Sequence, residues 1–396
     1  MKICMMLGHD FLHPQIDPRP YKEAKSLIKY GYDVFLVCWA ADFTGEGRSL
    51  KNLSPTEEFE GIKIIRVFQT LSPPRSTVLI RGFQQLIAMK KIGERVIKLK
   101  PYAIHCHDLN TLLSGVMAKK RLKVPLVYDS HEDWPGMFEP RSIVISKLAS
   151  ILEKILLKYV DCVITVSEEL VKKFKKHKQT NAVAIYNSRL LKELSQKEDT
   201  KELKKELKIS DDNFIVGYIG ALSKKRGIDN LIKSIKYVDN KDVKVLIVGG
   251  PESEVKNLRV LAEKEDVMDK VILTGHIPYF KVIPYFSLLN IGTVLFQPLP
   301  NHLIAAPNKL FEYMGMGLPL IVSDFPEMKH IVVDKSDCGI AIDPTNPEKI
   351  ADAITYLLEH PEEAKRMGEN GRRAVEEKYN WDKMEEKLLK LYRRLK

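Results

Sequence analysis

The sequence lacks the short motifs that mark several common classes of enzyme. It has no two cysteines separated by two residues, which argues against a structural zinc site. It has no G-x-x-x-x-G-K-[ST] stretch, which argues against a P-loop NTPase, and no G-x-G-x-x-G after a predicted strand, which argues against a dehydrogenase. The chemistry of this chain must therefore be sought in less compact arrangements of residues.

Cysteines are few and long apolar runs are missing. The five cysteines are odd in number and lie mostly in short apolar runs, which is typical of reduced, core-packed cysteine in the cytoplasm. The first ten residues, MKICMMLGHD, have too few apolar side chains for a signal peptide. No apolar run reaches the about 18 residues of a membrane helix. We expect a cytoplasmic protein, with peripheral contact at the inner face of the cell membrane left open.

Positive charge is in excess. The 396 residues carry a formal net charge of +11, which favours an anionic partner such as a nucleotide, a nucleic acid or an acidic membrane. No stripe of alternating aromatic and basic residues is available to stack bases, so we expect no nucleic-acid partner.

Short apolar runs alternate with segments of helical period along the whole chain, which predicts an α/β protein with parallel sheets covered on both faces. The pattern pauses in a Lys- and Glu-rich stretch and then restarts. We predict an N-terminal domain over residues 1–188, a linker over 189–212 and a C-terminal domain over 213–380, with an amphipathic helix over 381–396. Ligands of such doubly wound sheets bind at the carboxyl ends of the strands.

The stretch PNKLFEYMGMGLP predicts a helix from Pro307 to Met316, with Pro307 at its first position. Lys309 and Glu312 share a face, and Lys309 lies where the helix dipole disfavours a cation. A bound phosphate near Asn308 and Lys309 would reverse that penalty. The alternative is a surface ion pair between Lys309 and Glu312.

A second basic stretch, GYIGALSKKRGIDNLI, follows another predicted strand. Gly220 ends the strand, and Lys225 and Arg226 come before the next helix, where cations can hold a diphosphate. A solvated basic turn is the alternative. Gly249 ends a further strand and leaves room for a base or ribose to approach the backbone.

Histidines and acids collect at two strand ends in the first half. They come from AIHCHD and VYDSHED and include His107, Asp129, His131 and Glu132. Three interpretations remain open: a divalent metal site, a polar edge that binds a sugar, or histidines that cap loops. The diphosphate-binding loops of the second half favour the sugar edge, and we expect no metal. Gly8 and Arg19 border the same region, where Arg19 pairs with an anion or with Asp17.

These segments resemble a known family over nearly the whole chain. HCHDLNTL, PLVYDSHE, DCVITVSEELVKKF and AIYN are similar to the N-terminal domain of retaining glycosyltransferases of family 4. GYIGALSKKRGIDNLI, VLIVGG, VILTGHIP and PNKLFEYMGMGLPLIVSD are similar to the nucleotide-binding domain. The resemblance implies a GT-B fold, two Rossmann-like domains facing a cleft, with the terminal helix crossing back to the first domain.

The resemblance also assigns roles to residues. Arg226, helped by Lys225 or Lys309, would hold the donor diphosphate, Glu312 would accept from the ribose, and His107 would contact the donor sugar. Ile277 falls where a loop meets the base. The family has a glutamate where this chain has Ile304, and no D-x-D pair is present to hold a metal at the nucleotide.

The implied reaction moves a sugar from a UDP- or GDP-linked donor to a hydroxyl of a glycan or lipid-linked acceptor, with retention of configuration and no required cofactor. On the acceptor side we expect Arg19, Asp129, His131 and Glu132. The basic helical segments 75–100 and 141–158 suggest contact with an anionic membrane surface. The alternatives are a nucleotide-sugar epimerase, a metal-dependent hydrolase, or a degenerate transferase that acts as a binding partner.

Overall fold

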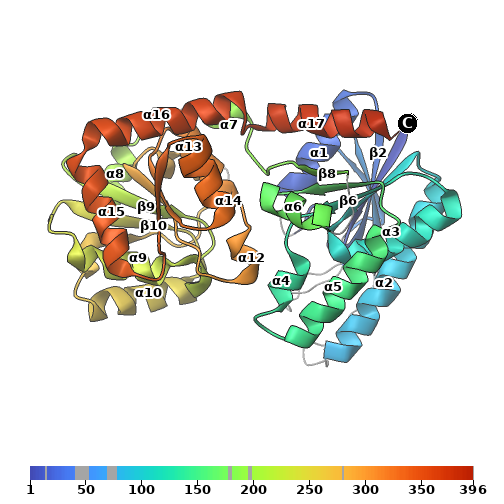
Figure 1. Ribbon diagram of the computed structural model, residues 1–396, viewed down its shortest axis with the longest axis horizontal. Coiled ribbons are helices and arrows are strands. Elements are labelled where there is room, and N and C mark those ends of the chain that lie inside the picture. The colour runs from blue at the N-terminus through green and yellow to red at the C-terminus, as the bar shows by residue number, and fades with distance from the viewer. Residues whose placement is uncertain are drawn as a thin grey trace. The chain divides into compact units, whose positions relative to one another are not determined.

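A computed structural model describes residues 1–13, 16–40, 53–68, 78–176, 181–194, 199–278 and 281–395. The chain divides into two compact units (Figure 1). The first comprises Met1–Ile185 and Glu385–Lys396, and the second comprises Tyr186–Met384. The sequence predicts domain boundaries at residues 188, 212 and 380. These boundaries stay a prediction, because the division into compact units does not show which segments fold independently.

The first unit is built on an eight-stranded sheet in the order β3-β4-β2-β1-β5-β6-β7-β8. All neighbouring pairs are parallel except β3 with β4. The strands are β1 (Lys2–Leu7), β2 (Asp33–Ala40), β3 (Thr56–Phe59), β4 (Ile62–Phe68), β5 (Ala103–His107), β6 (Leu126–Ser130), β7 (Cys162–Thr165) and β8 (Ala182–Ala184). The strands β1, β5 and β6 are buried along almost their whole length, as a sheet covered on both faces requires.

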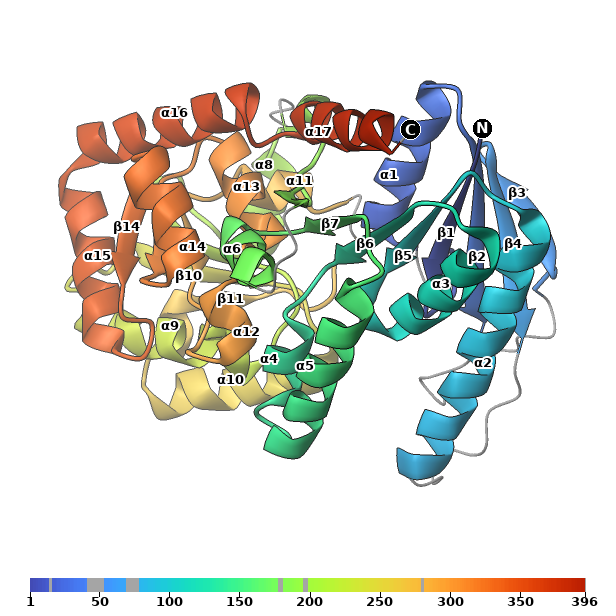
Figure 2. The ribbon, with the colours of Figure 1, turned by 45° about the vertical axis from the view of Figure 1, so that its right-hand side comes forward.

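Helices cover both faces of this sheet (Figure 2). They are α1 (Pro18–Lys29), α2 (Val78–Leu99), α3 (Asp108–Leu122), α4 (Trp134–Phe138), α5 (Ile143–Leu157) and α6 (Glu168–Lys176). The helix α17 (Trp381–Arg394) begins in the second unit, and its residues from Glu385 onward belong to the first. There the Tyr392 hydroxyl lies 2.8 Å from Nδ1 of His105, and Glu385 accepts from Ser26 and Lys29 of α1.

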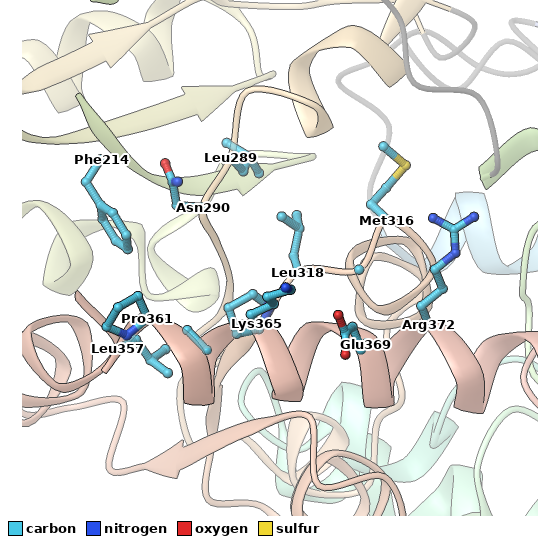
Figure 3. A pocket seen from close by; sticks show the side chains of 13 residues that line it. Phe214, Leu289, Asn290, Met316, Leu318, Leu357, Pro361, Lys365, Glu369 and Arg372 are labelled. Atoms are coloured by element: carbon cyan, nitrogen blue, oxygen red, sulfur yellow. The ribbon is translucent and has the colours of Figure 1, made fainter. Parts of the chain in front are cut away.

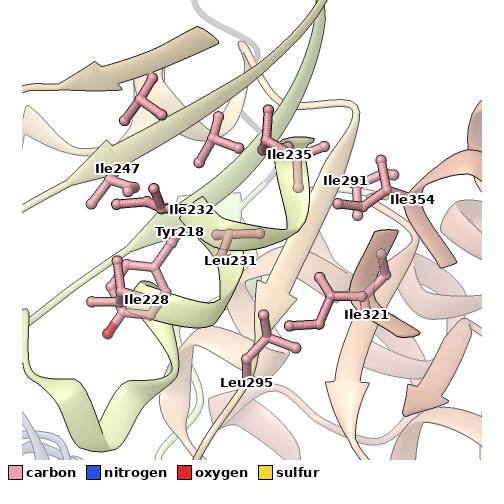
Figure 4. Close-up of a cluster of buried hydrophobic side chains, with 14 of the residues drawn as sticks. Tyr218, Ile228, Leu231, Ile232, Ile235, Ile247, Ile291, Leu295, Ile321 and Ile354 are labelled. Carbon is pink, nitrogen blue, oxygen red and sulfur yellow. The ribbon is translucent and has the colours of Figure 1, made fainter. Parts of the chain in front are cut away.

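The second unit has a six-stranded, wholly parallel sheet in the order β11-β10-β9-β12-β13-β14. Its strands are β9 (Phe214–Ile219), β10 (Val243–Val248), β11 (Val271–Leu273), β12 (Ile291–Val294), β13 (Leu320–Ser323) and β14 (Gly339–Ile342). One core layer packs α9 and α15 against this sheet, and Figure 4 shows Leu231 of α9 on the side of Ile321 and Ile354, with Ile232 beside Ile247. Apolar burial of this kind is the main force that stabilises the unit.

The helices of the second unit range from four to 17 residues in length. They are α7 (Leu191–Leu194), α8 (Lys201–Leu207), α9 (Ile228–Ser234), α10 (Glu252–Lys264), α11 (Ile283–Phe286), α12 (Pro300–Leu303), α13 (Asn308–Gly315), α14 (Pro326–Lys329), α15 (Pro347–Glu359) and α16 (Pro361–Glu377). The 3-10 turn Lys224–Arg226 precedes α9. The predicted linker therefore contains α7 and α8, while residues 195–198 lie outside the described part.

The sequence-based fold class, two doubly wound α/β halves, is confirmed. The helix predicted at 307–316 is present as α13, which is shorter by one residue at each end. Pro307 is the N-cap of α13, so the prediction that it occupies the first helical position is wrong by one residue. Its extended backbone, with ψ of 145°, keeps it outside the helix.

Candidate active site

Two glycines lie against each other at the carboxyl ends of β9 and β10. Gly220 has a φ of +141° and Gly249 a φ of +125°, which both favour glycine. A Cβ atom on Gly249 would stand 2.2 Å from the carbonyl oxygen of Gly220. The sequence interpretation, that these glycines admit a ligand, is therefore incomplete, because the close approach of one strand end to the other already excludes a side chain at Gly249.

Lys309, in the first turn of α13, is buried rather than exposed. Its ammonium nitrogen lies 3.6 Å from the centre of the Tyr218 ring and makes no hydrogen bond among the described residues. The same nitrogen would stand 2.8 Å from a Cβ atom on Gly220, so it lies directly beneath that strand end. Burial and then the charge of Arg226 lower the pKa of Lys309 well below its ordinary value.

This placement makes Lys309 a candidate ligand for an anion. A buried ammonium without an acceptor costs free energy, and the face of one tyrosine ring offsets only part of that cost. An anion at the start of α13 would restore the charge and complete the hydrogen bonds, and the dipole of the eight-residue helix acts in the same direction.

Arg226 stands at the end of the 3-10 turn before α9. Its guanidinium lies over the ring of Phe296, with 4.4 Å between the central carbon and the ring centre. Gly227 follows with a φ of +74°, and a Cβ atom there would be 1.9 Å from the carbonyl oxygen of Leu295. Only glycine lets this basic turn pack on the end of β12. Lys225 is exposed, and its carbonyl accepts from the backbone N–H of Gln297.

Glu312 does not form the alternative surface pair with Lys309. Its Oε1 accepts a hydrogen bond of 2.6 Å from Nε of Arg189, and both side chains are largely buried. Arg189 was missed in the sequence, where it stands alone in the stretch AIYNSRLL. A lone arginine directly before the two leucines Leu190 and Leu191 is the signal that could have pointed to a buried carboxylate partner.

The other predicted residues of this unit lie around the same strand ends. Ile277 is half-buried in the loop after β11, and Asn308 is exposed in the first turn of α13. Ile304 caps the C-terminus of α12 and is half-buried. Nδ1 of His302 already lies 2.9 Å from the carbonyl oxygen of Gln297, so this atom is not available to a sugar.

In the first unit the two predicted strand ends adjoin. His107 of β5 and Asp129 of β6 are register partners, and the rings of His105 and His107 stack with 4.5 Å between their centres. His105, His107 and Asp129 are fully buried, and His131 is 19% exposed at its side chain. The predicted cluster therefore exists, with His131 as its contact with solvent.

Arg19 lies inside this cluster. It donates to both oxygens of Asp129 at 2.8 and 2.7 Å and to the carbonyl of Ile185 at 2.8 Å. The alternative pairing with Asp17 is limited to the backbone N–H of Arg19, which Asp17 caps at the start of α1. Because its side chain is only 3% exposed, Arg19 positions Asp129 in this structure rather than reaching an acceptor.

Glu23, one turn further along α1, was missed by sequence reasoning. It is fully buried, its carboxylate lies 3.4 Å from the Arg19 guanidinium, and both of its oxygens lack hydrogen-bond partners among the described residues. Burial and the charge of Asp129 raise the pKa of Glu23 to about 8. In the sequence PRPYKEAKSLIK, Glu23 resembles a solvent-exposed helix residue. Its burial becomes evident only from its packing beside His105 of β5.

His131 carries the charge of the cluster. Burial alone would lower its pKa, but the carboxylates of Asp108 and Asp129 outweigh burial and raise the pKa to about 9. Its Nε2 lies 3.0 Å from Asp129 and 3.1 Å from Nδ1 of His107. Burial lowers the pKa of His107. Nε2 of His131 and Nδ1 of His107 both face Oδ2 of Asp129, at 3.0 and 3.3 Å, so this carboxylate orients both rings and leaves Nε2 of His107 turned toward Glu23.

Glu132 and Gly8 frame the cluster. Glu132 is exposed and its carbonyl accepts from Ser130. A Cβ atom on Gly8 would stand 2.1 Å from the side-chain nitrogen Nδ2 of Asn110, so the loop after β1 packs closely on α3.

The donor atoms of Glu23, His105, His107 and Asp129 lie within 4.8 Å of one another and are the type that binds divalent metals. Two features of the geometry disfavour that use. Both oxygens of Asp129 already accept from Arg19. The planes of the two histidine rings differ by only 13°, and an imidazole binds metal in its own plane, so one ring would have to turn. The arrangement suits a proton-sharing network better.

A hollow of about 420 Å³ lies elsewhere in the second unit (Figure 3). Phe214, Asn290 and Pro319 line it at the amino ends of β9, β12 and β13, and Lys365 and Arg372 of α16 close it. Since ligands of doubly wound sheets bind at the carboxyl ends, this hollow is not the candidate donor site.

Comparisons with known proteins agree with these observations. Residues 199–374 match the family described as glycosyl transferases group 1, and residues 21–188 match Glycosyltransferase Family 4. An uncharacterised glycosyltransferase of Methanocaldococcus jannaschii is 24% identical over 93% of this chain and 92% of its own length. The capsular polysaccharide biosynthesis glycosyltransferase CapM of Staphylococcus aureus is 26% identical over 45% of this chain and 46% of its own.

Solved structures show the same fold. Sucrose-phosphate synthase from Thermosynechococcus elongatus aligns with a TM-score of 0.80 at 19% identity over 100% of this chain and 99% of its own. Anabaena HepE in complex with UDP aligns with a TM-score of 0.77 at 16% identity over the full length of both. Two adjoining family matches, a relative of matching length and two doubly wound units lead to one conclusion: the chain is a glycosyltransferase of family 4 with the GT-B fold.

Proposed function

We propose that this glycosyltransferase uses a nucleoside diphosphate sugar, with UDP or GDP as the nucleotide, and transfers the sugar with retention of configuration. The observation that carries the proposal is the buried ammonium of Lys309 beneath Gly220, without an acceptor among the described residues and in the first turn of α13. A diphosphate is an anion that fits such a position. Arg226 is proposed as the second cation and Glu312 as the acceptor of ribose hydroxyls.

Relatives support the class of donor but differ in its base. HepE has been solved with UDP-glucose, and a trehalose-6-phosphate enzyme from E. coli with UDP-2-fluoro glucose. A mannosyltransferase of Corynebacterium glutamicum that is GDP-mannose-dependent is 26% identical over 48% of this chain. We therefore propose a UDP or GDP sugar and a hexosyl group, without a resident metal.

The proposed reaction takes place on one face of the sugar. The bond between C1 and the diphosphate oxygen breaks, and its electron pair leaves with the diphosphate. The acceptor oxygen bonds to C1 from the same face, and its proton passes to the departing diphosphate oxygen. Lys309, Arg226 and the start of α13 stabilise the charge that grows on the leaving group. His107, whose pKa burial lowers, is proposed to contact the donor sugar.

The proposed acceptor is a hydroxyl of a glycan or a lipid-linked sugar, met from the side of His131 and Glu132, in the cytoplasm at the inner face of the cell membrane. No helix in the described part of the chain combines the length and apolar character needed to cross a bilayer.

A nucleotide screen tests the proposal. The thermal midpoint of the full chain is measured with UDP, GDP and their sugars, for the wild type and for Arg226→Ala and Glu312→Ala. Arg259→Ala, an exposed arginine on α10, is the matched control. We expect at least one nucleotide to raise the midpoint of the wild type and of the control, and to raise those of the two site variants less. If no nucleotide raises the wild-type midpoint, the donor proposal fails.

Retention needs its own measurement. Once a donor is found, proton NMR of the first product formed reports the anomeric configuration directly. Product with the configuration of the donor supports the same-face reaction, and inverted product contradicts it.

A further inference from the structure

The helix α5 presents its apolar side to solvent. Its inward residues are small or polar for much of its length, with Ser146, Ala149 and Glu153 buried before Leu156 and Leu157. Its outward residues are large and apolar. The exposed set, each between 41% and 62% accessible, is Ile143, Val144, Ile145, Leu148, Ile151, Leu152 and Ile155. This reverses the usual pattern of a surface helix.

The exposed residues form one continuous stripe, called here the α5 stripe. Val144, Leu148, Ile151 and Ile155 recur at the spacing of a helical face and run along the helix. At a rise of about 1.5 Å per residue, the helix is about 22 Å long. Covering these seven side chains would remove a large apolar surface from water, which is favourable. So large an apolar surface indicates an interaction site.

The helix α5 packs on α3 and α4 (Figures 1 and 2). The side chains of the stripe remain exposed among the described residues. The exposed ring of Tyr159 continues it beyond the C-terminus of the helix, and Nζ of Lys120 lies 4.1 Å from the centre of that ring. An aromatic ring beside a cation is a frequent arrangement at a membrane interface.

Positive charges border the α5 stripe. Arg141 precedes the helix, and Lys147, Lys154 and Lys158 are exposed on or just beyond it. The only acid in the helix, Glu153, is buried and accepts from the Tyr128 hydroxyl at 2.9 Å. An apolar stripe flanked by cations without exposed acids on the same helix complements an anionic lipid surface, where the phosphates meet the lysines and the apolar side chains enter the acyl boundary.

The charges disfavour a second copy of the chain as the occupant. In a two-fold interface the same patch meets itself, so the basic border of one α5 would face the basic border of the other. Like charges brought together in this way oppose association.

We propose that the α5 stripe docks the first unit on an anionic lipid surface. The proposal rests on the proposed function in one respect, since a transferase with a lipid-linked acceptor must meet that acceptor at such a surface. It goes beyond that function by naming the residues that make the contact and the charge of the lipid that they prefer.

Vesicle flotation of the full chain tests the docking. The vesicles are neutral phosphatidylcholine alone or the same lipid with about one third phosphatidylglycerol, a content at which each basic residue near the surface adds about 1 kcal/mol. We expect binding to the anionic vesicles, weaker binding at high salt, and at least tenfold weaker binding to the neutral ones. Failure of the wild type to float, or equal flotation with both lipids, would overturn the proposal.

Substitutions separate the stripe from general charge. Leu148→Glu with Ile151→Glu places carboxylates in the stripe, and Val260→Glu, at a residue of α10 that is 63% exposed, is the matched control. We expect at least a tenfold loss of vesicle binding for the double variant and none for the control. A second variant, Lys147→Gln with Lys154→Gln, should lose the preference for anionic lipid. Unchanged binding of the Glu double variant would contradict the assignment.

Two further measurements on the same proteins identify the other outcomes. Light scattering gives the oligomeric state, and a wild-type dimer that the Glu double variant turns into a monomer would assign the stripe to a second copy and overturn the lipid proposal. The nucleotide thermal shift is repeated on each variant. If nucleotide raises the thermal midpoint of the wild type but the wild type does not bind vesicles, only the docking proposal is contradicted. If the wild type binds vesicles but no nucleotide raises its thermal midpoint, only the donor proposal is contradicted.

Discussion

Nε of Arg189 donates a hydrogen bond of 2.6 Å to Oε1 of Glu312, and the pair is shielded from solvent within the second unit. Arg189 precedes α7 and Glu312 lies in the middle of α13, so two segments separated by 123 residues are joined by one charged contact. The bond turns one oxygen of Glu312 toward the protein. Under the proposed function, the other is the one that would accept from a ribose.

Arg189→Ala should therefore weaken nucleotide binding through Glu312. We expect a threefold to tenfold rise in the Kd of the nucleotide that the screen identifies. A double-mutant cycle with Glu312→Ala, measured by calorimetry, should give a coupling free energy of about 0.7–1.4 kcal/mol, the whole effect of the single Arg189 substitution. Arg189→Lys keeps the charge but loses the planar donor, and should recover only part of the affinity. Additive effects of the two single substitutions would contradict an indirect role.

Lys309→Met should separate stability from binding. The methionine removes a buried amine that has no acceptor among the described residues, so we expect a thermal midpoint equal to or above that of the wild type. Nucleotide affinity should fall at least tenfold, or about 1.4 kcal/mol. Lys225→Met, at an exposed lysine of the same region, is the control and should have a smaller effect. A destabilised Lys309→Met protein would mean that the ammonium is part of the fold.

Nucleotide binding should also take up a proton. Burial lowers the pKa of Lys309 in the free protein, and a diphosphate beside it would raise that pKa. Affinity should then fall as pH rises above the free-state pKa, and level off above the bound-state pKa. Calorimetry in two buffers of different ionisation enthalpy measures the uptake, which Lys309→Met should abolish. Equal apparent enthalpies in both buffers for the wild type would count against this coupling.

The stability of the first unit should fall on the alkaline side of neutrality. The pKa of His131 rises from an ordinary 6.5 to about 9 on folding, so its contribution is fully present below pH 6.5 and is lost as the pH passes 9. The loss is on the order of 3 kcal/mol. Thermal unfolding from pH 6 to pH 9.5 measures it, and His131→Gln should flatten the profile above pH 6.5. An unchanged slope in that variant would assign the effect to other groups.

Glu23→Gln distinguishes a proton network from a metal site. The pKa of about 8 keeps Glu23 mostly neutral at pH 7, so an amide of the same shape should change the free energy of unfolding by less than about 1 kcal/mol. Glu23→Ala leaves a cavity and should cost about 2–3 kcal/mol. If Glu23 held a metal instead, Glu23→Gln would lower the bound metal measured by atomic emission, and a chelator would destabilise only the wild type.

The sequence predicts the scaffold well and the buried charges poorly, for a physical reason. Strands such as β1 are continuous apolar runs, and that pattern is local, so it can be read along the chain. The burial of Lys309 depends on Tyr218, 91 residues away, and that of Glu23 on β5. Charged residues at a few positions are indistinguishable from solvated ones until the packing is known. The resemblance to a family pointed to Glu312, but not to its partner Arg189.

The sequence predicts residues 141–158 only as a basic helical segment and does not predict which side of the helix is exposed. The sequence gives the period of its apolar residues, but the same period describes a helix that packs its apolar side inward. Ser146 and Ala149 lie on the buried side of α5, which packs on α3 and α4. Their small side chains allow a close approach, so the larger apolar residues lie on the outer side. Part of the other segment suggested for membrane contact, residues 75–77 and the side chains of 78–83, lies outside the described residues.

The C-terminal helix also constrains the order in which the protein can be assembled. The hydrogen bond between His105 and Tyr392 joins residues 287 positions apart, and Glu385 holds Ser26 across 359 positions. A ribosome that adds residues from the N-terminus completes the second unit before the last partner of the first one exists. In a chain that ended before Glu385, the first unit would lack two hydrogen-bond partners. His105 would have no Tyr392 hydroxyl, and Ser26 of α1 would have no Glu385 carboxylate.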